Sequence, residues 1–357
     1  MTRVAVVVGA NGVIGGNLVD HLQRSGDWEI VGLSRRGGTD AGRVRHIAVD
    51  LLDGDETHRR LVELTDVTHI FYAAYQERPS WAELVAPNLA MLVNVVTAIE
   101  ENSPDLEHVS LMQGYKVYGA HLGPFKTPAR ESDPPHMPPE FNVDQQQFLE
   151  ARQFGKRWTW SAIRPSVVCG VALGNPMNLA TVIAVYATMC AKLGVPMRFP
   201  GKPGAFGALL EMTDASLLAE ATVWAATTPT CANQAFNITN GDLFRWSEMW
   251  PRIAGLFDLD TATPLPMSLA DVMADKEPLW DSIVAEHGLQ STPYSDVSSW
   301  AFGDFVFSWD YDVIADGSKA RRMGFHRFVD TEAMFAGIFA ELRSRRIIPR
   351  GATLRGV

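Results

Sequence analysis

The sequence predicts an α/β fold in which a doubly wound parallel sheet is combined with a smaller, mostly helical C-terminal lobe. Three observations predict it. A β-branched strand near residue 3 runs directly into a glycine-rich turn and a helix. Strand-like and helix-like stretches then alternate through the first half, which is typical of a parallel sheet covered by helices on both faces. Finally, 357 residues that are 46% hydrophobic suffice to bury a large core in one elaborated domain or two.

The opening strand and turn form the first motif. Residues 3–9 read RVAVVVG, a run typical of a strand buried on both faces, and GANGVIG begins at its last residue. Gly9 permits the tight turn, Gly12 lets the backbone approach a pyrophosphate, and Gly15 allows close contact between helix and sheet. We therefore expect a Rossmann-type dinucleotide site, the alternative being a glycine turn without a ligand. The residues of this predicted site are Gly9, Asn11, Gly12, Val13, Ile14 and Gly15.

The end of the second strand indicates which dinucleotide is bound. Residues 28–33 form this strand, and Ser34, Arg35 and Arg36 follow it. An NAD site usually has an acidic residue here, which binds the ribose 2′-hydroxyl. A hydroxyl and two guanidinium groups suit a 2′-phosphate instead. The sequence therefore predicts NADP(H) as the cofactor, and the alternative is that both arginines are solvated loop charges.

The remaining strands bring further residues to the carboxyl edge of the sheet, where a dinucleotide binds. Asp50 and Leu51 follow the third strand and are expected to meet the adenine. Ala73 and Ala74 end the fourth strand and are small enough for the cofactor to pass. Other predicted cofactor contacts are Gln113, Lys116, Pro165, Ser166 and Val167. The strands are predicted at residues 44–49, 67–73, 108–112 and 158–163, and the helices near residues 56–64, 81–101 and from 144.

The chain is predicted to divide into two parts. Residues 1–170 are expected to form the NADP(H)-binding Rossmann domain, and residues 171–357 a substrate-binding lobe interwoven with the sheet. The tryptophans from Trp280 to Trp309 either pack in the core or line an apolar substrate cleft. Predicted elements of this half are helices at 178–193, 213–227, 246–256 and 269–288, a strand at 236–239 and a glycine-rich loop at 201–207.

Longer stretches, spread in order over nearly the whole chain, carry a resemblance to a known family. They include VVGANGVIGGNL, QGYKVYGAHLGPFKTPARESDP, SAIRPSVVCGVALGNPMNL and FNITNGDLFRW. In these stretches the chain resembles the progesterone 5β-reductase and iridoid-synthase-like enone reductases, an atypical branch of the extended short-chain dehydrogenases. The resemblance implies hydride addition from NADPH to the C=C bond of an enone. It also implies an active-site lysine after the fifth strand and a tyrosine in an NFYY-like motif.

The chain departs from that family at the tyrosine motif. Lys116 matches the family lysine, but EFNV at residues 140–143 stands where the family has NFYY, so both tyrosines are replaced, by Asn142 and Val143. Tyr115 replaces the threonine that usually precedes the lysine. The tyrosine–lysine pair of ordinary short-chain dehydrogenases, four residues apart on one helix, is also absent, because the expected window holds Val143 and Gln147.

Three residues are the candidate catalytic groups: Lys116, Asn142 and Tyr115. Conjugate reduction forms an enolate, whose oxyanion needs a hydrogen-bond donor more than a strong acid, and Asn142 offers one. The alternatives are that Lys116 only holds the nicotinamide ribose and that Asn142 only caps the following helix. Tyr115 would replace the lost phenol, but neighbouring residues of an extended segment point opposite ways.

Composition limits the partners. A net charge of −10 disfavours nucleic acid, since binding it requires a basic face. The three cysteines lack the spacing of a zinc site or disulfide framework, so buried thiols and no metal are expected. No signal peptide or membrane-spanning run is recognised, because the longest apolar stretch, residues 179–190, is too short. We expect a cytoplasmic protein with a small carbonyl compound as substrate and a homodimer as the usual assembly for such enzymes.

Three functions fit these observations. The first is an NADPH-dependent reductase of enones or other activated alkenes. The second is a non-redox cyclase, isomerase or aldolase-type lyase that retains the bound cofactor, as the lost tyrosines suggest. The third is a catalytically inactive protein that senses the NADP(H) redox state.

Overall fold

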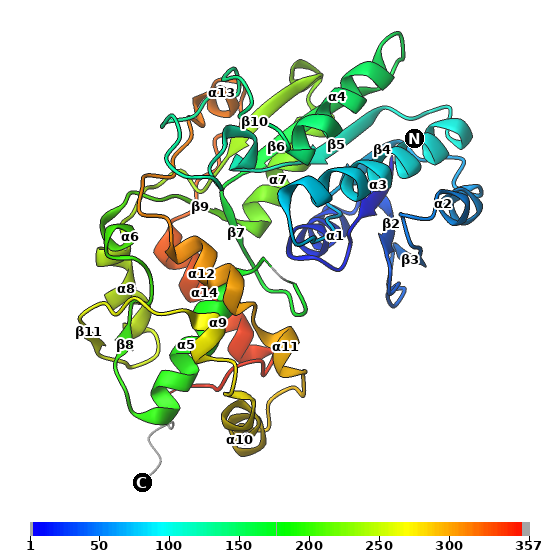
Figure 1. Cartoon of the computed structure of the whole chain (residues 1–357). Coiled ribbons are helices and arrows are strands. Elements are labelled where there is room, and N and C mark those ends of the chain that lie inside the picture. The colour runs from blue at the N-terminus through cyan, green and yellow to red at the C-terminus, as the bar shows by residue number, and fades with distance from the viewer. Residues whose placement is uncertain (1–2, 176, 352–357) are drawn as a thin grey trace. The chain divides into compact units, whose positions relative to one another are not determined.

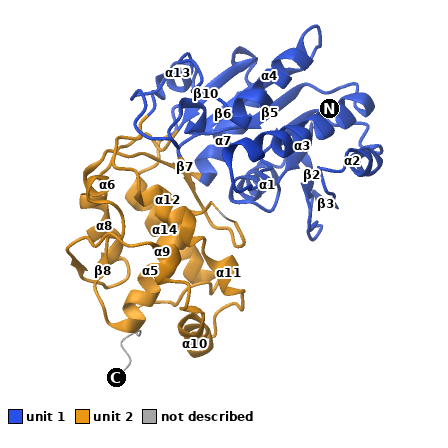
Figure 2. Cartoon of the chain, viewed as in Figure 1, with its two compact units in different colours: residues 1–166, 215–238, 315–327 blue, residues 167–214, 239–314, 328–357 orange. Residues whose placement is uncertain are grey.

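The structure is a computed structural model that describes residues 3–175 and 177–351 (Figure 1). The chain divides into two compact units (Figure 2). Unit 1 contains residues 1–166, 215–238 and 315–327, and unit 2 contains residues 167–214, 239–314 and 328–357. The division is interwoven, since each unit is built from three separate segments of the chain.

Unit 1 is built on a parallel sheet of seven strands in the order β10-β6-β5-β4-β1-β2-β3. The order reverses beside β1, which pairs with β4 on one side and β2 on the other. In doubly wound sheets, ligands bind at the carboxyl ends of the strands beside such a reversal. The predicted fold class is thus confirmed. The strands are β1 (Arg3–Val8), β2 (Trp28–Ser34), β3 (Val44–Ala48), β4 (His69–Tyr72), β5 (His108–Met112), β6 (Thr159–Pro165) and β10 (Gln234–Ile238).

Helices cover both faces of this sheet because alternate side chains of each strand point to opposite faces. Val6 and Val8 of β1 join a core cluster with α2, α3 and α4, whereas Ala5 and Val7 join a second cluster with α1 and α7. This double burial explains why β1 reads as a continuous apolar run. The helices of unit 1 are α1 (Val13–Ser25), α2 (Gly54–Leu61), α3 (Trp81–Asn102), α4 (Phe141–Gln153), α7 (Ala215–Thr227) and α13 (Ser318–Arg322), with 3₁₀ turns η1 (Tyr115–Tyr118) and η2 (Pro229–Cys231).

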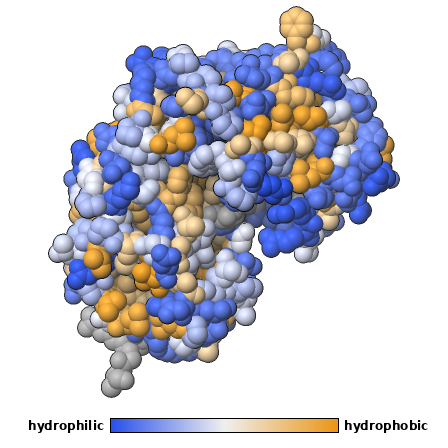
Figure 3. Space-filling model, viewed as in Figure 1, coloured by the Kyte–Doolittle hydropathy of each residue, from blue (hydrophilic) through white to orange (hydrophobic). Residues whose placement is uncertain are grey.

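The helix α3 has 22 residues and, among the described residues, is the one helix long and apolar enough to cross a membrane. Its residues Leu92, Val95 and Ile99 are fully buried in the core of unit 1. Packing against the sheet therefore accounts for its apolar composition. On the face shown in Figure 3, hydrophilic residues predominate and apolar ones form small separate patches.

Unit 2 is mostly helical. Its central helix α5 is apolar on all sides, and the residues from Leu179 to Ala191 are buried, as expected for a core helix. Aromatic rings of Phe199, Trp246, Trp250 and Phe307 pack together in its core, with centroids 5.3–6.0 Å apart. The elements are β7 (Val167–Cys169), α5 (Leu179–Leu193), β8 (Met197–Arg198), α6 (Pro203–Gly207), β9 (Met212–Asp214), α8 (Trp246–Gly255), β11 (Thr261–Ala262), α9 (Leu269–Val272), α10 (Glu277–His287), α11 (Tyr294–Val297), α12 (Trp300–Phe307) and α14 (Thr331–Ser344).

The structure corrects the predicted division after residue 170. Residues 215–238 and 315–327 belong to unit 1, because β10 forms the edge of the large sheet and α7 covers one face of it. A boundary drawn once along the sequence cannot describe a sheet whose last strand comes from the second half of the chain.

Three predicted elements of the second half also differ. The segment at 201–207 contains the short helix α6 rather than only a loop. The single helix predicted at 269–288 is two helices, since Pro278 lies in the first turn of a new helix, where its missing N–H costs nothing. The helix predicted from residue 213 begins at Ala215, because Met212–Asp214 pair with Val167–Cys169 as strand β9. The three cysteines, Cys169, Cys190 and Cys231, are free and buried, as predicted.

Candidate active site

The glycine-rich turn lies against the end of β4 at the reversal in the sheet. Gly9 has a φ of +85°, and a Cβ there would lie 2.8 Å from the carbonyl oxygen of Ala73 and 3.0 Å from the nitrogen of Ala74. A Cβ on Gly15 would lie 2.2 Å from the carbonyl oxygen of Gly9. Both glycines are therefore required for the close approach of turn, helix and strand.

The first turn of α1 is open to an anion. Its N-cap, Gly12, provides no side-chain hydrogen bond, so the backbone N–H groups of the first turn, including those of Val13 and Ile14, receive no cap. Unpaired N–H groups and the positive end of the helix dipole together attract a phosphate. The predicted pyrophosphate cradle has the geometry that such a ligand requires.

A polar contact fixes the loop after β2 beside this turn. The side-chain nitrogen of Asn11 donates to Ser34 Oγ at 2.9 Å and to the carbonyl oxygen of Gly37 at 2.8 Å. Ser34 Oγ itself donates to the Gly37 carbonyl at 2.9 Å. Arg35 and Arg36, between these anchors, are exposed, and neither guanidinium has an ion pair or hydrogen bond to the described part of the chain. Two unpaired guanidinium groups on an anchored loop fit a 2′-phosphate.

The predicted adenine contacts differ from one another. Asp50 is exposed, and one of its carboxylate oxygens accepts a hydrogen bond from the backbone N–H of Leu52 at 3.1 Å. Leu51 is instead buried in the core between the sheet and α3, and its carbonyl oxygen accepts a hydrogen bond from Asn94 at 2.8 Å. The Leu51 side chain is thus committed to packing, which leaves Asp50 as the accessible member of the pair.

Lys116 lies in η1, which follows β5 at the carboxyl edge of the sheet. Its Nζ lies 5.4 Å from the ring centroid of Tyr75 and 4.9 Å from that of Trp81. Burial lowers the pKa of Lys116, and the nearby carboxylates of Glu77 and Glu140 act in the opposite direction. No hydrogen bond joins Lys116 Nζ to any residue that the structure describes. The ammonium group is thus held by aromatic rings with its N–H donors unused.

The first turn of α4 carries the altered tyrosine motif. Its N-cap is Glu140, whose carboxylate accepts from the backbone N–H of Val143 at 3.2 Å. Asn142 is therefore not the cap. Its side-chain nitrogen donates to Glu140 Oε1 at 2.6 Å, so one amide proton is engaged and the other is available. Burial raises the pKa of Glu140, against the hydrogen bonds from Asn142 and Val143 and the charge of Lys116.

Gln113 has a structural role in this arrangement. Its side-chain nitrogen donates to the carbonyl oxygen of Asn142 at 2.8 Å, and its side-chain oxygen accepts from Arg164 Nε at 2.8 Å. Each end of the amide makes one of these bonds, which fixes the orientation of the side chain and leaves its second amide proton available. The side chain thereby connects the ends of β5 and β6 to the first turn of α4. Pro165 and Ser166, at the end of β6, are buried.

An extended segment was predicted around Tyr115, but the residue lies in a turn. It begins the 3₁₀ turn η1, is 5% exposed, and packs against Tyr118 with ring centroids 5.9 Å apart. The turn forms because Gly119, with a φ of +82°, ends it and donates to the carbonyl of Lys116 at 2.9 Å. A buried ring in this packing is a poor candidate for the lost phenol.

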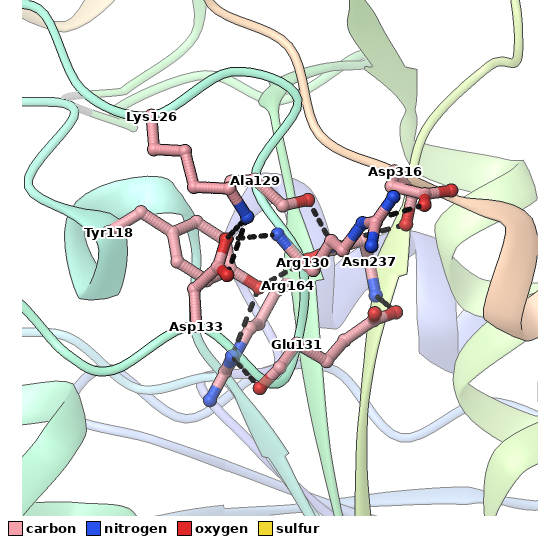
Figure 4. A network of polar contacts seen from close by, with 9 residues as sticks. All are labelled: Tyr118, Lys126, Ala129, Arg130, Glu131, Asp133, Arg164, Asn237 and Asp316. Atoms are coloured by element: carbon pink, nitrogen blue, oxygen red, sulfur yellow. Dashed lines mark hydrogen bonds and ion pairs between the residues drawn. The ribbon is translucent and has the colours of Figure 1, made fainter.

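A polar network holds the long loop after η1 in place (Figure 4). Arg164 on β6 donates to the Tyr118 hydroxyl at 3.0 Å and to the carbonyl oxygen of Glu131 at 3.4 Å. The Tyr118 hydroxyl donates to the Asn237 side-chain oxygen at 2.6 Å, and Glu131 accepts from the Asn237 backbone N–H at 2.9 Å. These bonds connect the loop to β6 and β10 of unit 1. These bonds leave no signal in the sequence, because they join residues far apart in the chain.

The partners of Lys116 were not predicted from the sequence. Tyr75 and Glu77 follow β4, while Trp81 begins α3 after its N-cap Ser80. Residues that follow a strand of a parallel sheet lie at its carboxyl edge, so their position after β4 was the available signal.

The strand order of the parallel sheet reverses beside β1, and the glycine cradle and the lysine after β5 lie at its carboxyl edge. Together these features define a dinucleotide-binding enzyme of the extended short-chain dehydrogenase/reductase class. The family model of the PRISE-like Rossmann-fold domain matches residues 47–349, and the chain belongs to this family. This finding confirms the resemblance identified in the sequence.

Curated relatives are similar in sequence to this chain over almost its entire length. The chain is 34% identical to an (S)-8-oxocitronellyl enol synthase of Nepeta racemosa, over 97% of this chain and 93% of that protein. It is 32% identical to a short chain dehydrogenase of Penicillium aethiopicum, over 98% and 100% of the two chains. Among solved structures, a UDP-glucose 4-epimerase complex with NAD from Thermus thermophilus has a TM-score of 0.67 at 19% identity, over 96% and 99% of the two chains. At this identity the structural match shows the fold alone.

Proposed function

We propose that the chain is an NADPH-dependent reductase of activated C=C bonds, which acts by 1,4-reduction on small apolar carbonyl compounds. The observation that carries this proposal is Lys116. Its ammonium group lies against the rings of Tyr75 and Trp81 without a hydrogen bond to any described residue. A cationic donor held ready in a partly desolvated position suits a carbonyl oxygen that gains negative charge during the reaction.

The residues around the proposed cofactor site fit NADP(H) rather than NAD. The uncapped start of α1 would hold the pyrophosphate, and Arg35 and Arg36 would bind the 2′-phosphate. Bound NADPH supplies a hydride to the β-carbon of the enone. Lys116 would bind the carbonyl oxygen and stabilise the enolate, and the second amide proton of Asn142 offers a further donor.

NADPH consumption with a panel of 2-cyclohexen-1-one, an acyclic enal and progesterone tests this proposal, with cyclohexanone as the saturated control. We expect oxidation of NADPH with at least one enone and none with cyclohexanone. Lys116→Met should lower kcat by about 100-fold or more, the usual effect of removing an oxyanion donor. Lys156→Met is the matched control, because Lys156 only pairs with Glu100 on the surface of unit 1. Absence of NADPH oxidation above background across the enones would contradict the proposal.

The replaced tyrosines favour a second candidate, a non-redox enzyme in which NADP(H) is bound but not consumed. Asn142 and Val143 stand where the family has its phenols. The lysine and the polar first turn of α4 could then serve a cyclisation, isomerisation or aldol-type step. Product formation without stoichiometric NADPH oxidation would favour this candidate, and a stoichiometry near one would exclude it.

A further inference from the structure

The structure brings another phenol to the lysine whose family tyrosine is missing. Tyr75 follows β4 directly after Ala73 and Ala74, at the carboxyl edge of the sheet. Its ring centroid lies 5.4 Å from Lys116 Nζ and 5.7 Å from the ring centroid of Phe141, the first residue of α4. The ring therefore contacts both the lysine and the altered motif.

The hydroxyl of Tyr75 is connected to solvent through a carboxylate. It donates a hydrogen bond to Glu77 Oε2 at 2.9 Å, and Glu77 is exposed. A phenol is protonated at neutral pH, and burial and the charge of Glu77 raise the pKa of Tyr75 further above its ordinary value. Rotation about the C–O bond is enough to redirect that proton from Glu77 to a neighbouring acceptor.

On the basis of the proposed reductase function, we propose that Tyr75 donates the proton to the enolate oxygen and thereby replaces the tyrosine lost from α4. The hydride from NADPH forms a C–H bond at the β-carbon, and the π electrons of the C=C bond move toward the carbonyl oxygen. The O–H bond of Tyr75 then breaks as the O–H bond of the enol forms. The phenolate is left beside the Lys116 ammonium and regains a proton from water through the solvent-facing side at Glu77.

Two other acidic groups near Lys116 each take part in two hydrogen bonds within unit 1. The carboxylate of Glu140 caps α4 and accepts hydrogen bonds from Val143 and Asn142. The Tyr118 hydroxyl bonds to Asn237 and Arg164 on the strands behind η1. Tyr75 is distinguished from both because its ring touches the lysine and its hydroxyl has a solvent-exposed partner.

Tyr75→Phe is the direct test, since it removes the hydroxyl and keeps the ring against Lys116. Tyr72→Phe is the matched control: Tyr72 lies on β4, is 2% exposed, and its hydroxyl has no hydrogen-bond partner in the described structure. We expect Tyr75→Phe to lower kcat for enone reduction by about 100-fold or more, the range for loss of a general acid. Tyr72→Phe should stay within about twofold of the wild type, since its hydroxyl is unbonded. An unchanged kcat in Tyr75→Phe would overturn the inference and leave the reductase proposal standing. The same conclusion would follow if Glu140→Gln lost about 100-fold in kcat and Tyr75→Phe did not.

A binding measurement separates the inference from the proposed reaction. The probe is 4-nitrophenolate, a stable oxyanion whose absorbance reports binding, titrated with and without NADP⁺. We expect Tyr75→Phe to bind it about tenfold more weakly than the wild type and Tyr72→Phe to bind it equally well, because of these two tyrosines Tyr75 alone is proposed to add a donor beside Lys116. This readout remains informative if the wild type oxidises NADPH with no enone, a result that defeats the reductase proposal by itself. Equal binding by the wild type and Tyr75→Phe would overturn the role of Tyr75 as an oxyanion donor.

Discussion

Replacing Arg35 and Arg36 by serine tests which dinucleotide the site prefers. Both guanidinium groups are exposed and unpaired within the described structure, so their removal should leave folding unchanged. A hydrogen bond to a charged group contributes about 1.5–3 kcal/mol, and screening at this exposed loop favours the lower value. At about 1.4 kcal/mol per factor of ten, each single variant should bind NADP⁺ about tenfold more weakly and the double variant about 100-fold.

Isothermal titration of the apo protein with NADP⁺ and NAD⁺ measures these changes. NAD⁺ affinity should change little in every variant, because NAD⁺ lacks the phosphate that the arginines are expected to bind. Arg59→Ser, on the exposed side of α2, serves as a control for the loss of one positive charge. Raising the salt concentration should reduce the difference between the two nucleotides. Equal affinity of the wild type for both, or equal losses in the double variant, would refute the assignment of these arginines to the 2′-phosphate.

Two further predictions concern stability. Gly15→Ala should destabilise the fold by about 1–3 kcal/mol and abolish NADP⁺ binding, because its Cβ would lie 2.2 Å from the backbone oxygen of Gly9. Gly16→Ala is the matched control, since the atom nearest to its Cβ would lie at 3.4 Å. Equal thermal stability of the two variants would contradict this prediction. Burial lowers the pKa of His69 from 6.5 to about 4 and that of His108 from 6.5 to about 3, so the unfolded chain binds protons that the native state does not. The contribution of the two neutral histidines to the free energy of unfolding is fully present above about pH 6.5. It is lost as pH falls toward 4, by about 3 kcal/mol for His69 alone. Urea unfolding across this range checks the slope, and a flat free energy would refute it.

Local patterns determined much of the dinucleotide site before any tertiary contact was known. Gly9 and Gly15 lie in one short turn, where the backbone geometry follows from the residues themselves. The strands were predictable for a similar reason, since burial on both faces leaves a continuous apolar run such as that of β1. Arg35 and Arg36 were placed by their position directly after a strand.

The catalytic neighbourhood could not be predicted in this way. Asn142 was a plausible cap from its position alone, but the cap is Glu140, whose carboxylate accepts from the Val143 N–H, while Gln113 donates to the carbonyl of Asn142. Gln113 in turn is held by Arg164, which is 51 residues away in the chain. Hydrogen bonds between residues so far apart leave no periodic signal in the sequence.

The sequence by itself determined the fold class and the cofactor cradle, because each follows from short-range periodicity or glycine geometry, and it indicated the lysine after β5 through the resemblance to a known family. Only the tertiary structure decided what surrounds that lysine. Tyr75 and Trp81 reach Lys116 from the connection after β4, and the neighbouring ends of β4 and β5 meet because the two strands pair in parallel register. Strand pairing depends on which buried surfaces fit together across the whole chain. For this physical reason, the motif that contains Lys116 could not predict the residues that surround it.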